Sequence, residues 1–483
     1  MNEAIRQLEP TALWNHFADL NAIPRPSKKE ERVIQFIKSF GEALKLPTTV
    51  DAVGNVIIKK PASQGMENKP TVVLQSHLDM VHQKNADTVF DFETQGIDMY
   101  IDGDWVKAKG TTLGADNGIG VASIMTLLAS TDIPHPALEA LFTIDEETGM
   151  TGALAFEGGL LEGHIMLNLD TEEDNELTIG CAGGIDVTAA GTYPSVKPTN
   201  STAFRISIKG LTGGHSGVDI HKGRGNANKL MNRCLFTLVK EAAVEVAAID
   251  GGSLRNAIPR ESKADIVVAN DQIEHVKQAV SDYHSILKSE YATTDPNVQV
   301  TIEAIDTPAQ VMDADFVFKL LRVVYACPNG IYRMSPDIAG LVQTSNNVAR
   351  ILVKDGKYSI QCLTRSSVDS EKTDLQMAIT AVLDLLGAEV TYSGAYPGWT
   401  PKPSSPIVKL MRELYEERYH EKPHVSACHA GLECGILGTH YPDMQMISFG
   451  PNIHGAHSPD EKVQISSVQK YWAYLLETLV RIN

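Results

Sequence analysis

Short apolar runs alternate with helical patterns over the first 170 residues, and this alternation narrows the possible folds more than any other property. Apolar runs typical of buried strands cover 71–75, 138–144 and 164–169. Apolar residues spaced as on one helix face cover 30–44, and a further helix is expected at 118–128. Strands that alternate with helices pair in parallel, because each crossover returns the chain to the same end of the sheet. We therefore expect an α/β domain with a mostly parallel sheet.

The pattern changes after residue 184. An alternating strand at 204–208 is followed by a helix at 226–242 and by strands at 264–268 and 298–303. The stretch 335–390 repeats this theme. Within it, Asn346-Asn347-Val348-Ala349-Arg350 is similar to Asn256-Ala257-Ile258-Pro259-Arg260, and each copy precedes a strand and then a helix. A repeated half is one interpretation of this similarity, and chance is the other.

A proline-rich stretch at 396–403 indicates the return to the first domain. A helix at 406–419, a strand at 444–449 and a final helix at 468–480 would complete it.

The length of 483 residues exceeds what one hydrophobic core usually supports, so two domains are expected. We assign 1–186 and 393–483 to one discontinuous α/β domain. The segment 187–392 is expected to be an inserted α+β domain that is made of two similar halves and acts as a lid.

The charge balance limits the possible partners. The chain carries 60 Asp and Glu against 42 Lys and Arg, a net charge of −18. Such an acidic protein is not expected to bind the nucleic-acid backbone or an anionic membrane surface.

Neither targeting nor disulfide signals are present in the sequence. The N-terminal residues lack the basic and apolar stretches of a signal peptide, and no apolar segment is long enough to cross a bilayer. Six cysteines are scattered without a CxxC pair, which argues against a disulfide framework and against a thiolate zinc site. We expect a cytoplasmic protein with reduced cysteines.

Five segments carry side chains that can bind metal, most of them where a strand ends. They are Ser76-His77-Leu78-Asp79, Gly114-Ala115-Asp116-Asn117-Gly118, Asp145-Glu146-Glu147-Thr148-Gly149, Asn168-Leu169-Asp170-Thr171-Glu172 and His454-Gly455-Ala456-His457-Ser458. Ligands of open α/β sheets bind outside the carboxyl ends of the strands, so these segments can converge there. Imidazoles and carboxylates without thiolates suit zinc, cobalt or manganese, and there are enough of them for two ions that share one carboxylate.

The local spacing of these residues suggests which of them bind metal and which support the ligands or act as a base. His77 and Asp79 lie on the same side of an extended chain, as a ligand and the carboxylate that orients it would. The adjacent acids Glu146 and Glu147 can separate base and ligand roles. Taken alone, His77 is more often a buried core histidine, and the two glutamates are more often a solvated turn. Dinucleotide binding and serine hydrolysis are rejected, because the chain lacks both GxGxxG and GxSxG.

The motifs GADNGIG, DEETGMTGA, NLDTEE, GGHSGVDIHKGRGNA and HGAHSPDE occur in this order over nearly the whole chain. Together they resemble the co-catalytic zinc peptidases, which include aminoacylases, glutamate carboxypeptidases and carnosinases. Within that superfamily they look like the bacterial aminoacyl-histidine dipeptidases. Each motif alone is weak, but the combined order is highly specific.

The resemblance implies roles for the metal-capable residues, and none of these positions departs from the family pattern. His77 and Asp170 match ligands of a first metal, Glu147 and His457 match ligands of a second, and Asp116 matches the carboxylate that bridges them. Glu146 matches the general base, and Asp79 matches the residue that orients His77. The family also implies a cis peptide bond between Asp116 and Asn117.

The resemblance extends to residues of the expected lid and of a later loop. His215 matches a histidine that helps to hold the oxyanion, while Asn256 and Arg365 resemble groups that bind the substrate carboxylate, which suits an arginine fork. Gly431 and Glu433 lie in a segment that resembles a loop bordering the substrate. The alternatives are a turn residue for His215 and structural roles for Asn256 and Arg365.

The implied function is metal-dependent hydrolysis of small peptides. The expected substrates are dipeptides with a free N-terminus and a preference for C-terminal histidine, including β-alanyl-histidine. The expected cofactor is a pair of divalent ions per chain, zinc or else cobalt or manganese. The family also implies a homodimer formed through the lid. Rival functions are an N-acyl amino acid deacylase or a tripeptidase on the same core, and a non-catalytic peptide- or metal-binding protein.

Overall fold

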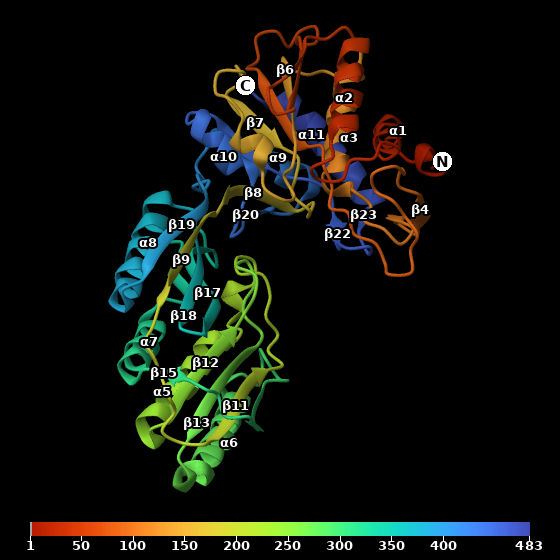
Figure 1. Cartoon of the computed structure of the whole chain (residues 1–483). Coiled ribbons are helices and arrows are strands. Elements are labelled where there is room, and N and C mark those ends of the chain that lie inside the picture. The colour runs from red at the N-terminus through yellow and green to blue at the C-terminus, as the bar shows by residue number, and fades with distance from the viewer. Residues whose placement is uncertain (1) are drawn as a thin grey trace. The chain divides into compact units, whose positions relative to one another are not determined.

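The computed structural model describes residues 2–483, and they form two compact units. The split unit comprises Met1–Gly180, Trp399–Ala427 and Leu432–Asn483, and the inserted unit comprises Cys181–Gly398 and Cys428–Gly431. In Figure 1, the red start and the blue end of the chain both lie in the split unit. The expected domain boundaries at 186/187 and 392/393 stay predictions.

An eight-stranded sheet forms the centre of the split unit. Its order is β1-β2-β6-β3-β7-β21-β8-β20. The strands are β1 (Thr48–Val50), β2 (Val56–Lys60), β3 (Val72–His77), β6 (Leu138–Thr143), β7 (Ile165–Asn168), β8 (Glu176–Cys181), β20 (His424–Cys428) and β21 (Gln445–Ser448). The strands β6, β3, β7 and β21 pair in parallel, whereas β1, β2 and β8 pair antiparallel with their neighbours. All residues of β3 and β6 are buried, as central strands covered on both faces must be.

Helices cover this sheet and hold its polar strand ends in place. They are α1 (Thr11–Leu20), α2 (Glu31–Ala43), α3 (Ala115–Ala129), α4 (Thr151–Leu154), α9 (Pro406–Tyr419), α10 (Glu433–His440) and α11 (Ile465–Arg481). The nearly fully buried α3 packs against α1 and β3. On the face that carries Val73, Leu141 and Met166, the apolar side chains of α10 complete the core. A smaller sheet has the order β22-β23-β5-β4, with β4 (Met99–Asp102), β5 (Trp105–Ala108), β22 (Ile453–His454) and β23 (Lys462–Gln464).

The inserted unit is built on a nine-stranded antiparallel sheet. Eight strands have the order β14-β11-β13-β12-β17-β18-β9-β19, and β16 pairs with β17 outside this path. They are β9 (Gly183–Thr192), β11 (Thr202–Lys209), β12 (Glu245–Gly251), β13 (Ser262–Val268), β14 (Gln299–Ile305), β16 (Gly330–Met334), β17 (Val342–Lys354), β18 (Lys357–Ser366) and β19 (Glu389–Tyr396). The short strands β10 (Ser195–Val196) and β15 (Val311–Met312) pair separately.

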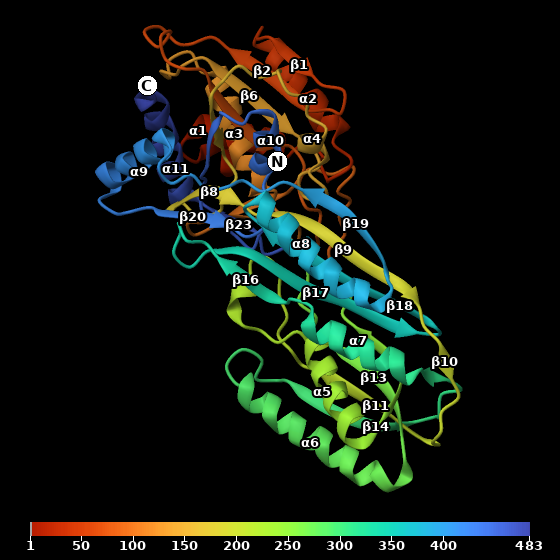
Figure 2. The same cartoon turned by 90° about the vertical axis from the view of Figure 1, so that its left-hand side faces the viewer.

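Four helices lie along one face of this sheet, as Figure 2 shows. They are α5 (Ala227–Ala242), α6 (Ile273–Glu290), α7 (Ala314–Ala326) and α8 (Asp369–Leu383). One half runs β11-α5-β12-β13-α6-β14 in chain order. The other half begins with β9, which precedes the first half, and continues after it as α7-β17-β18-α8-β19, with β16 as an additional strand between α7 and β17. Both halves therefore follow the same βαββαβ path, and they join where β12 pairs with β17.

The expected α/β class is confirmed, with a parallel sheet centre in one unit and a separate antiparallel sheet in the other. The similarity between the segments at 256–260 and 346–350 falls at positions that are not equivalent. Asn256 lies in the connection between β12 and β13, whereas Asn346 lies within β17. Among residues 2–483, no helix combines the length and the apolar character needed to cross a membrane.

Candidate metal centre

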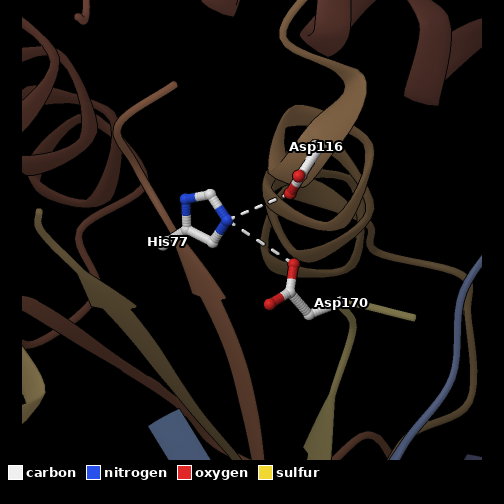
Figure 3. A group of neighbouring side chains, drawn as sticks. All are labelled: His77, Asp116 and Asp170. Atoms are coloured by element: carbon white, nitrogen blue, oxygen red, sulfur yellow. Dashed lines mark hydrogen bonds and ion pairs between the residues drawn. The ribbon is translucent and has the colours of Figure 1, made fainter. Parts of the chain in front are cut away.

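His77, Asp116 and Asp170 form a compact trio at the carboxyl end of the parallel strands. The His77 Nε2 atom lies 3.2 Å from Asp116 Oδ1 and 3.5 Å from Asp170 Oδ1. Figure 3 shows the imidazole at the end of β3 turned toward both carboxylates. The trio is held in the protein interior, because the His77 side chain is 1% exposed and the two aspartates are 13% and 10% exposed.

A second trio shares Asp116 with the first. The Nε2 atom of His457 lies 3.3 Å from Asp116 Oδ2 and 3.0 Å from Glu147 Oε2. Asp116 thus turns one carboxylate oxygen to each trio. Within each trio, one ligand atom of every residue lies within 4.8 Å of the others.

The local fold explains why residues so far apart in the chain meet here. His77 ends β3, whereas Glu147 follows β6 and Asp170 follows β7, so three neighbouring parallel strands deliver them to one edge. Asp116 comes from the first turn of α3, where the helix is kinked. His457 lies in the loop between β22 and β23 and has a positive φ of 66°.

The peptide bond between Asp116 and Asn117 is cis, as the resemblance implies. The Asn117 side chain donates hydrogen bonds to the Leu169 carbonyl, at 2.6 Å, and to Asp170. Asn117, which follows the shared Asp116, therefore also holds Asp170 of the first trio in place.

Asp79 links His77 to the segment that carries Glu146 and Glu147. Its Oδ1 atom lies 3.3 Å from His77 Nδ1 and accepts the Glu146 N–H at 3.0 Å. Its Oδ2 atom accepts the Glu147 N–H at 3.3 Å and the Ser27 hydroxyl at 2.8 Å. This carboxylate is fully buried, so it can hold the imidazole and the two glutamates in one arrangement.

The electrostatics of the site follow from crowded carboxylates in a buried space. Burial lowers the pKa of His77, but the nearby carboxylates, led by Asp170, outweigh burial and hold that pKa well above its usual value. Hydrogen bonds to Asp116 and Glu147 raise the pKa of His457 to about 11. Burial raises the pKa of Glu146 well above its ordinary range, and neighbouring acids add to the effect. The split unit thus holds excess negative charge at this edge, which attracts cations.

The donor set fits a pair of divalent ions. Each trio offers one imidazole and carboxylate oxygens, a set that zinc, cobalt and manganese accept. Imidazoles bind metal only when the ligating nitrogen has lost its proton, so a cation would replace the protons that the carboxylates favour on His77 and His457. Candidate metal-binding groups are therefore present, and all five residues expected as ligands belong to them.

The predicted lid residues His215, Asn256 and Arg365 lie in the inserted unit, where Arg365 is buried, His215 is half-buried and Asn256 is exposed. Arg365 is 4% exposed, donates to the Tyr396 hydroxyl at 2.7 Å and lies 3.4 Å from Ser216 Oγ. No carboxylate lies within ion-pair distance of its guanidinium among residues 2–483. His215 is half-buried, pairs across a short bridge with Ala257, and precedes Ser216, whose N–H donates to the Asn256 carbonyl.

His429 lies close to Arg365 and His215, although the sequence analysis assigned it no role. It is buried, and its Nε2 atom lies 2.8 Å from the Ser345 hydroxyl. Its Nδ1 atom is buried without a hydrogen-bond partner among residues 2–483. Burial lowers the pKa of His429 to about 3, and the charge of Arg365 adds to this effect. The cluster is therefore cationic around Arg365, because the neighbouring carboxylate of Asp186 forms its ion pair with Arg255, at 3.3 Å, and not with Arg365.

The two residues predicted to border the substrate fall in different units. Gly431 is half-buried at the end of the inserted unit. Glu433 begins α10 in the split unit, is 2% exposed, and accepts hydrogen bonds at 2.6 Å from both Gln75 and Thr143. It therefore joins two strands that carry the site, and its contact with substrate stays a prediction.

Sequence reasoning also left out Arg25 and Glu461, two buried charges that hold the loop before Asp116. Glu461 closes the quoted motif HGAHSPDE, so its place four residues after His457 is a signal that could have been used. Arg25 stands in no motif, and only the folded chain brings it to the site.

Comparisons with known proteins relate the whole chain to peptidases. Residues 73–481 match the model of peptidase family M20/M25/M40. The cytosol non-specific dipeptidase of Escherichia coli strain K12 is 44% identical over 479 residues, which cover 99% of both chains.

The solved structures agree with this relationship. The crystal structure of aminoacylhistidine dipeptidase from Vibrio alginolyticus superposes with a TM-score of 0.93 at 44% identity, covering 100% of this chain and 99% of that one. An aminopeptidase from Bacillus cereus is similar in fold alone, with a TM-score of 0.57 at 14% identity over 98% of this chain and 100% of that one.

Proposed function

The chain belongs to peptidase family M20/M25/M40, and from this membership we propose that it is a metal-dependent dipeptidase. The proposed substrates are Xaa-His dipeptides with a free N-terminus, including β-alanyl-histidine. Support comes from full-length similarity, at 44% identity, to a protein named cytosol non-specific dipeptidase and to one named aminoacylhistidine dipeptidase.

The observation that carries the proposal is the sharing of Asp116 between two trios of ligand atoms. In the proposed assignment, His77 and Asp170 hold one ion, Glu147 and His457 hold the other, and Asp116 bridges them. We propose zinc, with cobalt or manganese as substitutes. When bound, such a pair supplies Lewis-acid polarisation of the scissile carbonyl and increases the acidity of the attacking water.

Glu146 is the proposed general base. Burial and neighbouring acids raise the pKa of Glu146, and bound cations would lower that pKa, so that the carboxylate is ionised and can accept a proton. In the proposed reaction it takes the proton of the attacking water and then delivers it to the leaving amine nitrogen. Asp79 holds the backbone of Glu146 and Glu147 by two N–H hydrogen bonds, so base and ligand keep a fixed spacing.

The cationic cluster of the inserted unit is the proposed site for the substrate's C-terminal carboxylate. Arg365 is buried, and among residues 2–483 its partners are the hydroxyls of Tyr396 and Ser216 and no carboxylate within ion-pair distance, which supports a role in binding an anion. Asn256 is proposed to assist it. His215 is proposed to hold the oxyanion, and Gly431 and Glu433 are proposed to border the substrate.

The inserted unit is the proposed lid. Its two βαββαβ halves support the interpretation of two similar halves. We also propose a homodimer formed through this unit. The proposed location is cytoplasmic, which the name of the relative from Escherichia coli supports.

A substrate panel tests the proposed function. The purified protein is stripped with a chelator, reloaded with zinc, cobalt or manganese, and assayed on Xaa-His dipeptides, N-acetyl amino acids and tripeptides. We expect turnover that depends on metal and is fastest on Xaa-His dipeptides. Faster hydrolysis of N-acetyl amino acids would indicate a deacylase, and faster hydrolysis of tripeptides would indicate a tripeptidase. A metal-loaded protein that hydrolyses none of these would indicate a binding protein.

A further inference from the structure

Glu461 is a buried carboxylate that accepts hydrogen bonds from four successive backbone N–H groups. Its Oε2 atom accepts from Leu113 at 2.7 Å and from Gly114 at 3.0 Å. Its Oε1 atom accepts from Ala115 at 2.8 Å and from Asp116 at 3.2 Å. The residue is 2% exposed, so these contacts take the place of water.

These N–H groups need an acceptor because of where they lie. They enter the first turn of α3, whose amide groups have no carbonyl one turn earlier to bind. The helix is kinked at Asp116 and Asn117, and Gly114 has a positive φ of 71°. A carboxylate at a helix N-terminus is also favoured by the helix dipole. Glu461 therefore fixes the segment that delivers the shared carboxylate of the two trios.

Arg25 binds the same segment through its carbonyl side. Its guanidinium donates to the Gly114 carbonyl at 2.6 Å and to the carbonyls of Leu78 and Asp79 at 3.0 and 3.1 Å. Arg25 is 1% exposed and has no salt bridge to a carboxylate in the described part of the chain. It ties the loop after His77 to the loop before Asp116. A Cβ atom at Gly114 would lie 2.6 Å from this guanidinium, which shows how closely the two groups pack.

The three loops that supply His77, Asp116 and His457 are thus joined by one buried anion and one buried cation. Glu461 lies four residues after His457, so it connects the His457 loop to the Asp116 loop. Neither charge belongs to a trio of ligand atoms. Their hydrogen bonds go to backbone groups and, for Arg25, also to the Asn21 side chain, so what they determine is the path of the chain.

We propose that Glu461, together with Arg25, is a positioning residue that holds Asp116 midway between His77 and His457, where its two oxygens can serve two ions. This inference rests on the proposed function, because it concerns how the proposed ions are held. Glu461 acts through the Asp116 backbone and does not touch the substrate.

The test compares Glu461→Gln with Glu417→Gln, an exposed glutamate of the split unit. Zinc affinity is measured by competition with a chelating dye. Because one bridging carboxylate serves both ions, we expect Glu461→Gln to weaken both binding steps by about 10- to 100-fold, the usual effect of losing a partner that orients ligands. Glu417→Gln should bind zinc like the wild type. Cobalt-loaded Glu461→Gln should show altered visible absorption bands, which a change in stability alone would not produce.

Amide hydrogen exchange of the metal-free protein gives a readout independent of metal and activity. The amides of residues 113–116 should be protected in the wild type and should exchange at least about tenfold faster in Glu461→Gln, because the buried acceptor is weakened. If that variant does not fold, the exchange rates of the same amides in the wild type test the inference. Exchange of residues 113–116 at the rate of an open loop would overturn it.

Three other outcomes separate this inference from the function on which it rests. A lower melting temperature with unchanged zinc affinity would make Glu461 a stabilising residue only, and would overturn the inference. Recovery of zinc affinity in Glu461→Asp, which restores the carboxylate, would support it. A wild-type protein that binds no zinc would refute the proposed function itself, whatever the variants do.

Discussion

In the split unit His77 and His457 lie among carboxylates, whereas in the inserted unit His215 and His429 lie near the guanidinium of Arg365. These surroundings shift the pKa values of the histidines in opposite directions. The pKa of His457 rises to about 11, through hydrogen bonds to Asp116 and Glu147. The pKa of His215 falls to about 4, and that of His429 to about 3, through burial and the charge of Arg365.

This contrast shows what each region lacks. The split unit gathers acids whose charges the described protein does not balance, which suits it to bind cations. In the inserted unit, the buried Arg365 has no carboxylate within ion-pair distance among the described residues, since the nearby Asp186 pairs with Arg255, and this suits the region to bind an anion. In the proposed function, the metal ions complete the first region and the C-terminal carboxylate of a dipeptide completes the second.

The largest expected effect comes from Glu146, the proposed general base in the split unit. Glu146→Gln should lower kcat by about 10²- to 10⁴-fold, because the attacking water loses its proton acceptor. Metal content, measured by atomic emission, should stay at two ions per chain. The exposed Glu162→Gln serves as the control. Normal turnover in Glu146→Gln would remove Glu146 from the mechanism.

Removing the cation of the inserted unit should have the next largest effect. Arg365→Gln should lower kcat/KM for dipeptides by about 30-fold or more, since losing one partner of a buried charge pair costs about 2–5 kcal/mol. Dipeptide amides, which lack the carboxylate, should be poor substrates of the wild type and should lose little further in the variant. An equal loss on both substrate classes would show that Arg365 serves only the fold. The exposed Arg333→Gln provides the matched control.

Metal removal should weaken the split unit in particular. Zinc binds the folded protein and replaces repulsion among Asp116, Glu147 and Asp170, so it should stabilise by about 2.7 kcal/mol at about 100 times its Kd. Scanning calorimetry of the stripped and reloaded protein should show the melting temperature rise by several degrees. A melting temperature that zinc leaves unchanged would count against a metal site formed by the fold.

The smallest effect is a pH dependence of stability from His429. Its folded pKa of about 3 lies below the unfolded value of about 6.5, so only the unfolded chain gains this proton as the pH falls between them. The contribution is complete above pH 6.5 and declines below it, by about 1.4 kcal/mol at pH 5.5. Urea unfolding at pH 7.5 and 5.5 should therefore show a smaller drop for His429→Gln than for the wild type. Equal drops would show that His429 does not titrate on unfolding.

Much of the split unit is predictable from the sequence. Central parallel strands must be apolar on both faces, so the runs that became β3, β6 and β7 stand out, and polar residues directly after them mark the edge where the trios form. The antiparallel strands β1, β2 and β8, which flank the parallel centre, were not predicted. The expected helices over 30–44 and 406–419 are confirmed by α2 and α9.

The supporting residues are harder to predict, because their partners are backbone atoms. Arg25 and Glu461 bind carbonyl and N–H groups that every residue has, so no pattern of side chains predicts the pairing. Glu433 was predicted to border the substrate from its motif, whereas its burial against Gln75 and Thr143 follows from α10 packing on the sheet. The place of His429 near Arg365 depends on the segment Cys428–Gly431, which joins the inserted unit only in the folded chain.

The central claim is that one carboxylate, Asp116, serves two ions at once. X-ray diffraction of zinc-loaded crystals, recorded on both sides of the zinc absorption edge, tests this claim most directly. We expect two anomalous peaks ~3.5–4 Å apart, one beside His77 and Asp170 and the other beside Glu147 and His457, with Asp116 between them. A single peak, or two peaks that share no contact with Asp116, would contradict it.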